Sequence, residues 1–157
     1  MSVEAALQAA RLSGDFSPLV EVIPYLQFLG VRVEPREGRR VFVMPFADHL
    51  VGNPTVPALH GGTLGGLLES IAHLEQIATA QSPRLPKTIT LTIDYLRSGK
   101  TRDTFAAARV VKTGRRVTTL QCVAWQEDEN APIASAMVIL KVGPSSGEEI
   151  SGAKRTG

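Results

Sequence analysis

A carboxylate follows a His-Gly-Gly sequence at a spacing that could support acyl-transfer chemistry. His60, Gly61 and Gly62 come directly before a long helical pattern, and Glu69 lies nine residues after the histidine. A helix start offers free N–H groups and a partial positive charge, so the Gly61 and Gly62 amides could hold a carbonyl oxygen as it becomes negative. An ionised carboxylate two turns further along could attack a thioester or activate a water molecule.

The face of this helix that carries Glu69 is rich in glycine. Each glycine inside a helix costs about 1 kcal/mol relative to alanine, so we expect another backbone or a ligand to approach closely there. Three simpler interpretations stay open: Glu69 could be a solvated surface residue, it could pair with His73 one turn along, and Gly61-Gly62 could only ease the turn into the helix. The face consists of Gly62, Gly65, Gly66, Glu69, His73 and Gln76.

The elements that would position these residues differ in hydrophobic period. An apolar stripe at i, i+3, i+4 and i+7 spacing predicts a helix over 61–80, and a period of two predicts a strand from Lys87 to Tyr95. Thr113-Gly114 suggests a hairpin. Further strands are expected over 30–34, 39–45, 104–112, 115–126 and 133–142, a loop over 49–59, a helix over 2–12, and a helical turn broken at Pro24 within 18–29.

This order of elements predicts an α+β fold. Consecutive strands with short connections favour an antiparallel sheet, here of about six strands with one long covering helix. A single helix on such a sheet leaves much apolar surface to hide. Self-association is therefore expected.

Composition excludes several classes of protein. The 157 residues suit one domain, and a net charge of +2 is too small to indicate nucleic-acid binding. The single cysteine, Cys122, excludes a disulfide framework and a cysteine-based zinc site, and we expect it to be packed rather than reactive. The three histidines match no metal-ligand spacing. The longest apolar run, 136–140, is too short to span a membrane, no signal peptide is evident, and a cytoplasmic location is expected.

The segment Leu59-His60-Gly61-Gly62, with an acidic residue nine places after the histidine, resembles the HGG signature of PaaI-like hotdog-fold acyl-CoA thioesterases. The resemblance covers roughly residues 20–142 and includes Asp94-Tyr95-Leu96-Arg97 and Gly114-Arg115-Arg116. It implies a hotdog fold, in which an antiparallel sheet of five or six strands wraps a long central helix. The expected organisation is an N-terminal helical segment over 1–19, a thioesterase-like domain over 20–142 and a flexible tail over 143–157.

The resemblance also assigns roles to residues at the matching positions. It implies that Glu69 is the catalytic carboxylate, as general base or nucleophile, that the Gly61 amide polarises the thioester carbonyl, and that His60 orients the loop. Asn53 matches an asparagine that positions water or the carbonyl, although it lies one place further from the histidine than the pattern has it. Many relatives carry Asp where this chain has Glu69, and the extra methylene, about 1.5 Å, favours direct attack.

The substrate implied is an acyl-CoA, and coenzyme A is part of that substrate, so no metal or organic cofactor is expected. Gly62 and Tyr95 are candidate substrate-binding residues. The family builds its site across a dimer interface, so a homodimer or a dimer of dimers is expected, and Tyr95 or Arg97 could serve the other subunit's site. Phosphates favour arginine and lysine, although these could also be ordinary solvated charges. The candidate phosphate ligands are Arg97, Lys100, Arg102, Arg115 and Arg116.

Two rival functions on the same fold stay open. The segment from His49 to Pro57 resembles the loop of acyl-carrier-protein dehydratases, which pair a histidine with a helix carboxylate. Glu69 follows His49 by 20 positions, longer than the dehydratase spacing, and the His-Gly-Gly between them is not a dehydratase feature. The second rival is a non-catalytic acyl-CoA binding protein, which the presence of Glu69 disfavours.

Overall fold

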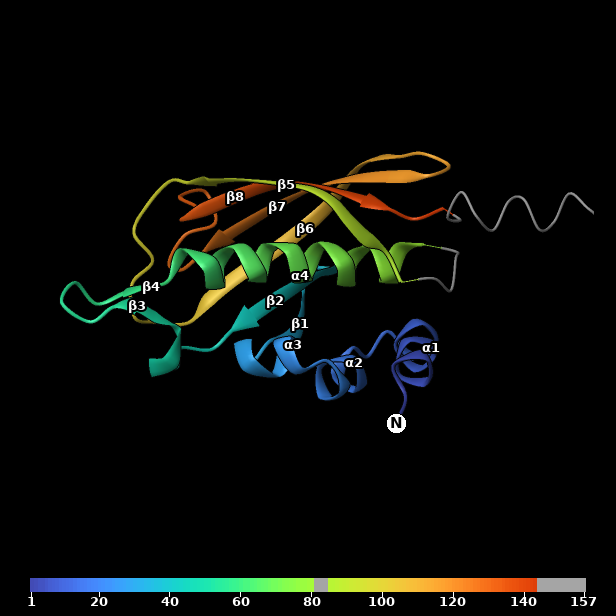
Figure 1. The fold of residues 1–157 in the computed structure, drawn as a ribbon, viewed down its shortest axis with the longest axis horizontal. Coiled ribbons are helices and arrows are strands. Elements are labelled where there is room, and N and C mark those ends of the chain that lie inside the picture. Colours follow the sequence, from blue (N-terminus) through green and yellow to red (C-terminus); the bar gives the residue numbers. More distant parts are fainter. Residues whose placement is uncertain (81–84, 144–157) are drawn as a thin grey trace, which may run out of the picture.

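A six-stranded antiparallel sheet wraps one side of a long helix in the computed structural model, which describes residues 1–80 and 85–143 (Figure 1). The strand order in the sheet is β1-β2-β6-β7-β8-β5. The predicted α+β architecture, with a long helix packed on an antiparallel sheet, is confirmed. The bounds are β1 Arg32–Arg36, β2 Arg39–Met44, β5 Lys87–Tyr95, β6 Thr104–Thr113, β7 Val117–Trp125, β8 Ala134–Lys141, and the helix α4 Gly61–Thr79.

The core lies between α4 and the inner face of the sheet. Leu67, Leu68 and Ile71 on the predicted apolar stripe of α4 are completely buried. They pack with alternate residues of the strands, such as Leu120 and Val138, which are also completely buried. Burying one such side chain stabilises the fold by about 1.5–3 kcal/mol, so this layer fixes the position of α4.

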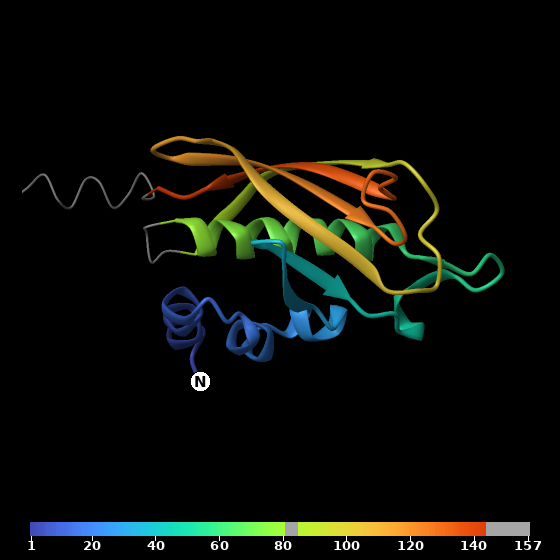
Figure 2. The same cartoon turned by 180° about the vertical axis from the view of Figure 1, so that it is seen from behind.

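Three N-terminal helices cover the other side of α4 (Figure 2). They are α1 Val3–Ser13, α2 Ser17–Val22 and α3 Pro24–Leu29. Prolines in the first turns of α2 and α3 start each of these short helices, in keeping with the break expected at Pro24. Because α4 is sandwiched, the glycine-bearing face is only partly open to solvent: Gly62 is exposed, whereas Gly65 is buried and Gln76 is only 5% exposed.

The stretch expected as a loop over 49–59 is instead partly regular. It contains a short 3-10 helix, η1 Asp48–Leu50, and a two-stranded hairpin of β3 Val51–Asn53 and β4 Ala58–Leu59. The prolines and the glycine of this stretch predicted irregular backbone, but Val51 pairs with Leu59 across two short strands. This hairpin was not predicted, because its strands are too short to display a hydrophobic period.

Two strands also differ from the expected pattern. Strand β1 begins at Arg32 rather than at Gly30, because Gly30 adopts a left-handed conformation, with φ 66°, that ends α3. In β5 the register shifts between Thr88 and Thr90, where Ile89 is 54% exposed. This bulge leaves Thr88 on the helix side of the sheet, so the simple alternation expected along β5 does not extend to its first residues.

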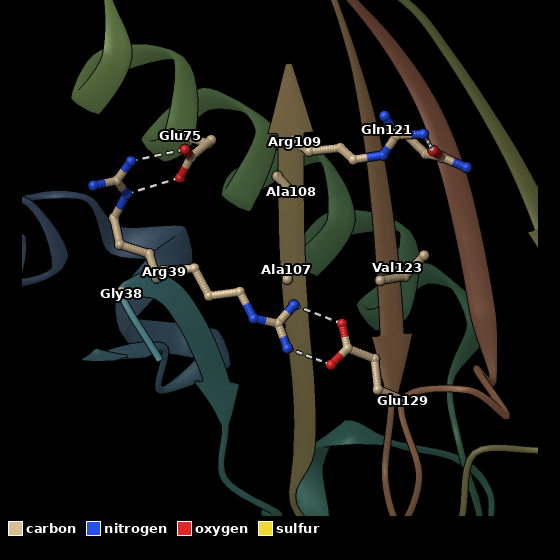
Figure 3. Close-up of a pocket in the computed structure, with 10 residues that line it drawn as sticks. Gly38, Arg39, Glu75, Ala107, Ala108, Arg109, Gln121, Val123 and Glu129 are labelled. Atoms are coloured by element: carbon tan, nitrogen blue, oxygen red, sulfur yellow. Dashed lines mark hydrogen bonds and ion pairs between the residues drawn. The ribbon is translucent and has the colours of Figure 1, made fainter. Parts of the chain in front are cut away.

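A gap between β2 and β6 forms a cavity of about 470 Å³, because the two strands pair only over Phe42–Met44 of β2 (Figure 3). Four of the charged residues around it form two ion pairs, and Arg109 bonds to Gln121. Arg40 makes two hydrogen bonds of 2.7 and 2.8 Å with Glu75 of α4, and Arg39 pairs with Glu129. The first contact ties β2 to α4, and the second ties β2 to the segment between β7 and β8.

Cys122 is completely buried on the inner face of β7. Burial, with a smaller contribution from Glu75, raises the pKa of its thiol to about 12. The expectation that this cysteine is packed is confirmed. No helix in the described part of the chain has both the length and the apolar character needed to cross a membrane.

Candidate active site

The first turn of α4 is capped by His60. Its Nδ1 accepts a hydrogen bond of 2.8 Å from the Gly62 N–H, and its carbonyl oxygen accepts from the N–H groups of Thr63 and Leu64, at 2.9 and 3.4 Å. Of the four N–H groups at the start of α4, the Gly61 N–H is the one with no acceptor among the described residues. A free donor therefore lies at the positive end of the helix.

The capping bond also determines the form of the imidazole. Since Nδ1 accepts a hydrogen bond, a neutral His60 carries its proton on Nε2. The Gly62 N–H is occupied by the cap, so the two glycine amides of the His-Gly-Gly sequence are not equivalent. Gly61, rather than Gly62, is the amide available to a ligand.

Two neighbouring segments hold His60 in place. Its N–H donates to the Leu50 carbonyl at 2.8 Å, and the N–H of the preceding Leu59 donates to the Gly99 carbonyl at 2.9 Å. Gly52 lies against the histidine so closely that a Cβ there would come within 2.9 Å of the His60 Cβ and Cδ2 atoms. Only glycine fits at position 52 while the cap is formed.

Tyr95 at the end of β5 closes the other side of the helix start. Its hydroxyl donates a hydrogen bond of 2.8 Å to the Gly61 carbonyl, and a Cβ on Gly61 would lie 3.3 Å from its ring. A Cβ on Gly65 would lie 2.8 Å from Ile93 Cδ1, and one on Gly66 would collide with the Tyr25 ring of α3. The glycines do mark close approach, as expected, but the approaching groups are side chains of this chain rather than a backbone or a ligand.

Glu69 lies one turn after Gly65 and Gly66, on the strip of α4 between β5 and α3. Its side chain is half-buried, and no described residue donates a hydrogen bond to its carboxylate. No hydrogen bond joins Glu69 to His73, and His73 Nε2 instead lies 3.0 Å from the Thr88 hydroxyl. Burial lowers the pKa of His73, against a smaller opposite effect of the Glu69 charge. Within the described part of the chain, Glu69 is thus a carboxylate without a hydrogen-bond partner, and its charge acts on the neighbouring His73 ring.

The remaining predicted site residues lie further away. The Asn53 side-chain oxygen accepts from the Thr55 and Val56 N–H groups at 2.9 and 3.4 Å, so it stabilises the turn between β3 and β4. A catalytic role for Asn53 stays a prediction. Arg97 follows β5 and donates to the Pro132 carbonyl at 2.7 Å.

Arg115 and Arg116 occupy the turn between β6 and β7. Figure 1 shows this turn at the opposite end of the sheet from the start of α4. The ten residues of β6 span roughly 33 Å at the usual rise of a strand. One chain therefore does not bring these two arginines to the helix start.

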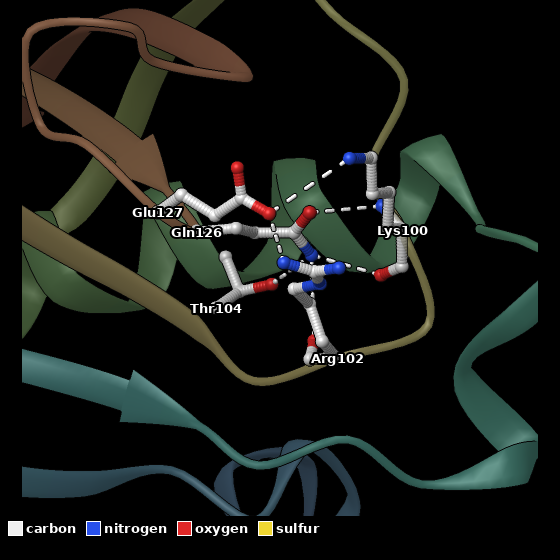
Figure 4. Close-up of polar contacts among 5 residues, drawn as sticks. All are labelled: Lys100, Arg102, Thr104, Gln126 and Glu127. Atoms are coloured by element: carbon white, nitrogen blue, oxygen red, sulfur yellow. Dashed lines mark hydrogen bonds and ion pairs between the residues drawn. The ribbon is translucent and has the colours of Figure 1, made fainter.

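Gln126, just after β7, is a positioning residue that the sequence analysis missed (Figure 4). Its side-chain oxygen accepts from the Lys100 N–H at 2.9 Å, and its amide nitrogen donates to the Lys100 carbonyl at 2.8 Å and to the Thr104 hydroxyl at 3.2 Å. These bonds fasten the loop over 96–103, whose Gly99 carbonyl receives the Leu59 N–H. The contact spans 26 residues of sequence, and a lone glutamine at a strand end gives no sequence signal for it.

Two cations of the same loop share one carboxylate. The Lys100 ammonium lies 3.8 Å from Glu127, and Arg102 forms an ion pair with the same group. These side chains are 46–66% exposed, so solvent screens the pairs. Both cations remain accessible to an anionic ligand.

Comparison with known proteins connects this geometry to one family. The family described as acyl-CoA thioesterase N-terminal domain matches residues 52–140, more than half of the chain. The medium/long-chain acyl-CoA thioesterase YigI of Escherichia coli is 28% identical over 157 residues, covering 90% of this chain and 99% of that protein.

Solved structures share the fold over nearly the whole chain. A protein from Chromobacterium violaceum is 29% identical, with a TM-score of 0.73 over 88% of this chain and 96% of its own. A phenylacetic acid degradation-related protein from Ralstonia eutropha is 21% identical, with a TM-score of 0.71 over 85% and 98%. A Bacillus halodurans protein solved with CoA is 19% identical, with a TM-score of 0.69 over 91% and 89%.

Replacing His60 tests the capping bond. His60→Ala removes the Nδ1 acceptor, and we expect the free energy of unfolding to fall by about 1 kcal/mol, as for other lost helix caps. His60→Asn keeps a side-chain acceptor and should recover most of that loss. Urea unfolding followed by circular dichroism measures both values. Equal stability of the alanine and asparagine variants would contradict the cap.

Replacing Gln126 tests whether it fastens the loop that holds His60. In Gln126→Leu, amide exchange of Leu59 should accelerate at least about tenfold, because local opening of the 96–103 loop becomes easier while global unfolding changes little. Hydrogen exchange followed by NMR measures this rate. Gln121→Leu, on β7 just before Gln126, is the matched control, since Gln121 contacts Arg109 instead. An unchanged Leu59 rate, or the same acceleration in both variants, would refute the role.

Proposed function

This chain belongs to the family of the acyl-CoA thioesterase N-terminal domain and is a thioesterase, and we propose that it hydrolyses acyl-CoA at the start of α4, with Glu69 and the Gly61 N–H as its catalytic groups. One observation carries this assignment. Among the described residues, the Gly61 N–H is the amide of the first helical turn without an acceptor, and no donor bonds to the Glu69 carboxylate. Eight residues, about 12 Å of helix, separate the two groups, so the proposed site pairs the Gly61 N–H of one copy with Glu69 of a second copy.

The Gly61 N–H is suited to hold the thioester carbonyl oxygen. That oxygen becomes negative as the carbonyl carbon turns tetrahedral, and a fixed donor aimed at such an oxygen typically contributes about 3 kcal/mol to transition-state stability. His60 and Tyr95 act as positioning residues, since they hold the Gly62 N–H and the Gly61 carbonyl. The helix start adds a partial positive charge at the same place.

Glu69 then has two possible tasks. As a nucleophile, its carboxylate oxygen bonds to the carbonyl carbon and expels the CoA thiolate, and water hydrolyses the resulting anhydride to release the acid. As a general base, it takes a proton from a water molecule that attacks the same carbon, and the thiolate leaves in the same way. The length of the Glu69 side chain favours the first route. The products are a free acid and CoA in both cases.

The CoA part of the substrate calls for cations near the helix start. Arg97, Lys100 and Arg102 follow β5 in the loop whose Gly99 contacts Leu59, so they are candidates for the CoA phosphates. The CoA bound to the Bacillus halodurans protein supports a CoA ligand on this fold. Carboxylate, backbone amide and water suffice for the proposed chemistry, which therefore calls for no metal or organic cofactor.

We also propose that the protein acts as a homodimer or a dimer of dimers. β5 is an edge strand with exposed apolar residues: Ile89 is 54% exposed and Tyr95 56%. If two β5 strands pair antiparallel, the Lys87 end of one copy meets the Tyr95 end of the other. The β6–β7 turn lies at the Lys87 end, so a second copy would bring its Arg115 and Arg116 towards this helix start.

A cytoplasmic location fits a chain whose one cysteine is a buried thiol.

Glu69 variants separate hydrolysis from the rival functions. In Glu69→Gln, thiol release from acyl-CoA should fall by a factor of at least about 100, because the carboxylate that attacks or takes the proton is gone. Acyl-CoA binding, measured by calorimetry, should change little. Glu4→Gln, on the exposed surface of α1, is the matched control and should keep the wild-type rate.

Three outcomes would contradict the proposal. A Glu69→Gln rate equal to that of the wild type would remove Glu69 from the chemistry. Binding of acyl-CoA with thiol release at background in the wild type would favour a binding protein. Loss of water from a 3-hydroxyacyl thioester without thiol release would favour a hydratase or dehydratase.

The oligomer is tested by sedimentation velocity at micromolar concentration. We expect a mass of two or four chains, and Ile89→Asp should shift the protein towards the monomer because it places a charge on the exposed edge. Val111→Asp is the matched control, since Val111 is similarly exposed, at 47%, but lies on β6 inside the sheet order. A monomeric wild-type protein would contradict the dimer.

A further inference from the structure

The Tyr25 hydroxyl of α3 lies on α4 one turn before Glu69. A Cβ built on Gly66 would overlap the Tyr25 hydroxyl oxygen and would lie 2.7 Å from Cε1 of the ring. The hydroxyl therefore stands where a side chain at position 66 would begin. Among the described residues it has no hydrogen-bond partner, and because Tyr25 is 46% exposed, water and substrate can reach it.

Three aromatic rings fix the position of this hydroxyl. The Tyr25 ring stacks on Phe28, with centroids 5.8 Å apart and planes at 18°, and Phe28 meets the His49 ring at 4.7 Å. His49 in turn donates from Nε2 to the Phe28 carbonyl, at 2.7 Å. Ring pairs at such separations are attractive. The stack runs from α3 to η1, so the Tyr25 hydroxyl is held in place from outside α4.

The Glu69 side chain faces this hydroxyl across bare helix backbone. Side chains of an α-helix lean over the residues three and four positions earlier, which for Glu69 are Gly66 and Gly65. Cβ atoms three residues apart on a helix are about 5–6 Å from each other, and a glutamate carboxylate reaches about 3.5 Å beyond its Cβ. No hydrogen bond joins the two groups in the described part of the chain. The separation suits one water molecule bonded to both groups at about 2.8 Å.

We propose that the Tyr25 hydroxyl is a further catalytic group of this site, which holds the attacking water against Glu69. The inference rests on the proposed function, since it takes Glu69 as the reacting carboxylate. The water donates one O–H to the Glu69 carboxylate and the other to the Tyr25 oxygen, which leaves the lone pairs of the water free to attack. A water with two fixed partners is already oriented when the acyl group arrives.

The same water serves both routes open to Glu69. If Glu69 is the base, the water oxygen bonds to the thioester carbon, the water proton passes to Glu69, and the carbon–sulfur bond breaks to release the CoA thiolate. If Glu69 is the nucleophile, the water oxygen bonds to the acyl carbon of the anhydride, the bond from that carbon to the Glu69 oxygen breaks, and the freed carboxylate takes the proton. Tyr25 keeps its own proton in both cases. One copy thus supplies the carboxylate and the water, and the second copy supplies the Gly61 N–H.

Tyr25→Phe tests this role, because it keeps the ring and its stacking on Phe28 and removes only the hydroxyl. We would measure thiol release from the best substrate among butyryl-, decanoyl- and palmitoyl-CoA. We expect kcat to fall at least about tenfold, because the water loses one of its two partners, while KM and the urea midpoint change little. Thr119→Val, which removes a hydroxyl from the face of β7 that points away from α4, is the matched control and should keep the wild-type kcat.

Hydroxylamine separates a lost water from a loosened site. It attacks the same acyl carbon to form a hydroxamate, and it does not depend on a water held by Tyr25. After subtraction of the enzyme-free reaction, the ratio of hydroxamate to free acid should therefore rise in Tyr25→Phe by the factor by which hydrolysis falls.

The outcomes separate this inference from the proposed function. If the wild type releases no thiol from any of the three acyl-CoAs, the proposed function fails and the inference fails with it. If the wild type is active and Glu69→Gln is not, but Tyr25→Phe keeps the wild-type kcat, only the role of Tyr25 is refuted. A raised KM at unchanged kcat would make Tyr25 a substrate contact, and a lower kcat at an unchanged hydroxamate ratio would make it a structural residue. Either result overturns the proposal.

Discussion

The capped first turn of α4 is the constraint on which the site depends. His60 satisfies the N–H groups of Gly62, Thr63 and Leu64 by itself, through one ring nitrogen and one carbonyl oxygen. No acceptor in the described part of the chain meets the Gly61 N–H, which lies at the positive end of a helix of 19 residues. Much of the surrounding structure serves this turn, since Leu50 of η1 accepts from the His60 N–H and Gly99 of the 96–103 loop accepts from the N–H of the preceding Leu59.

The glycines of α4 then decide how closely other elements approach. Two consecutive glycines, Gly65 and Gly66, allow Ile93 of β5 and Tyr25 of α3 to press against the helix from its two sides. The carboxylate of Glu69 therefore lies on a narrow strip between a strand and a helix.

Much of the fold was predictable because it depends on local periodicity. The stripe that contains Leu67 and Ile71 predicted the central helix, and the alternation in β5 predicted a strand at nearly the observed bounds. The prediction was wrong for the loop over 49–59, where Val51 and Leu59 pair in strands too short to show a period. It was incomplete for the glycines, since nothing in the sequence indicated that Tyr25 would lie against Gly66.

The sequence by itself determined the central helix, the sheet strands and the placing of a carboxylate two turns after His60, because these follow from residues close to one another along the chain. Only the tertiary structure decided which amide stays free, what closes on the glycines and how the loop at Lys100 is fastened. These depend on Tyr95, Tyr25 and Gln126, each at least 26 residues from its partner. Such contacts arise when packing brings distant elements together, and no local pattern encodes them.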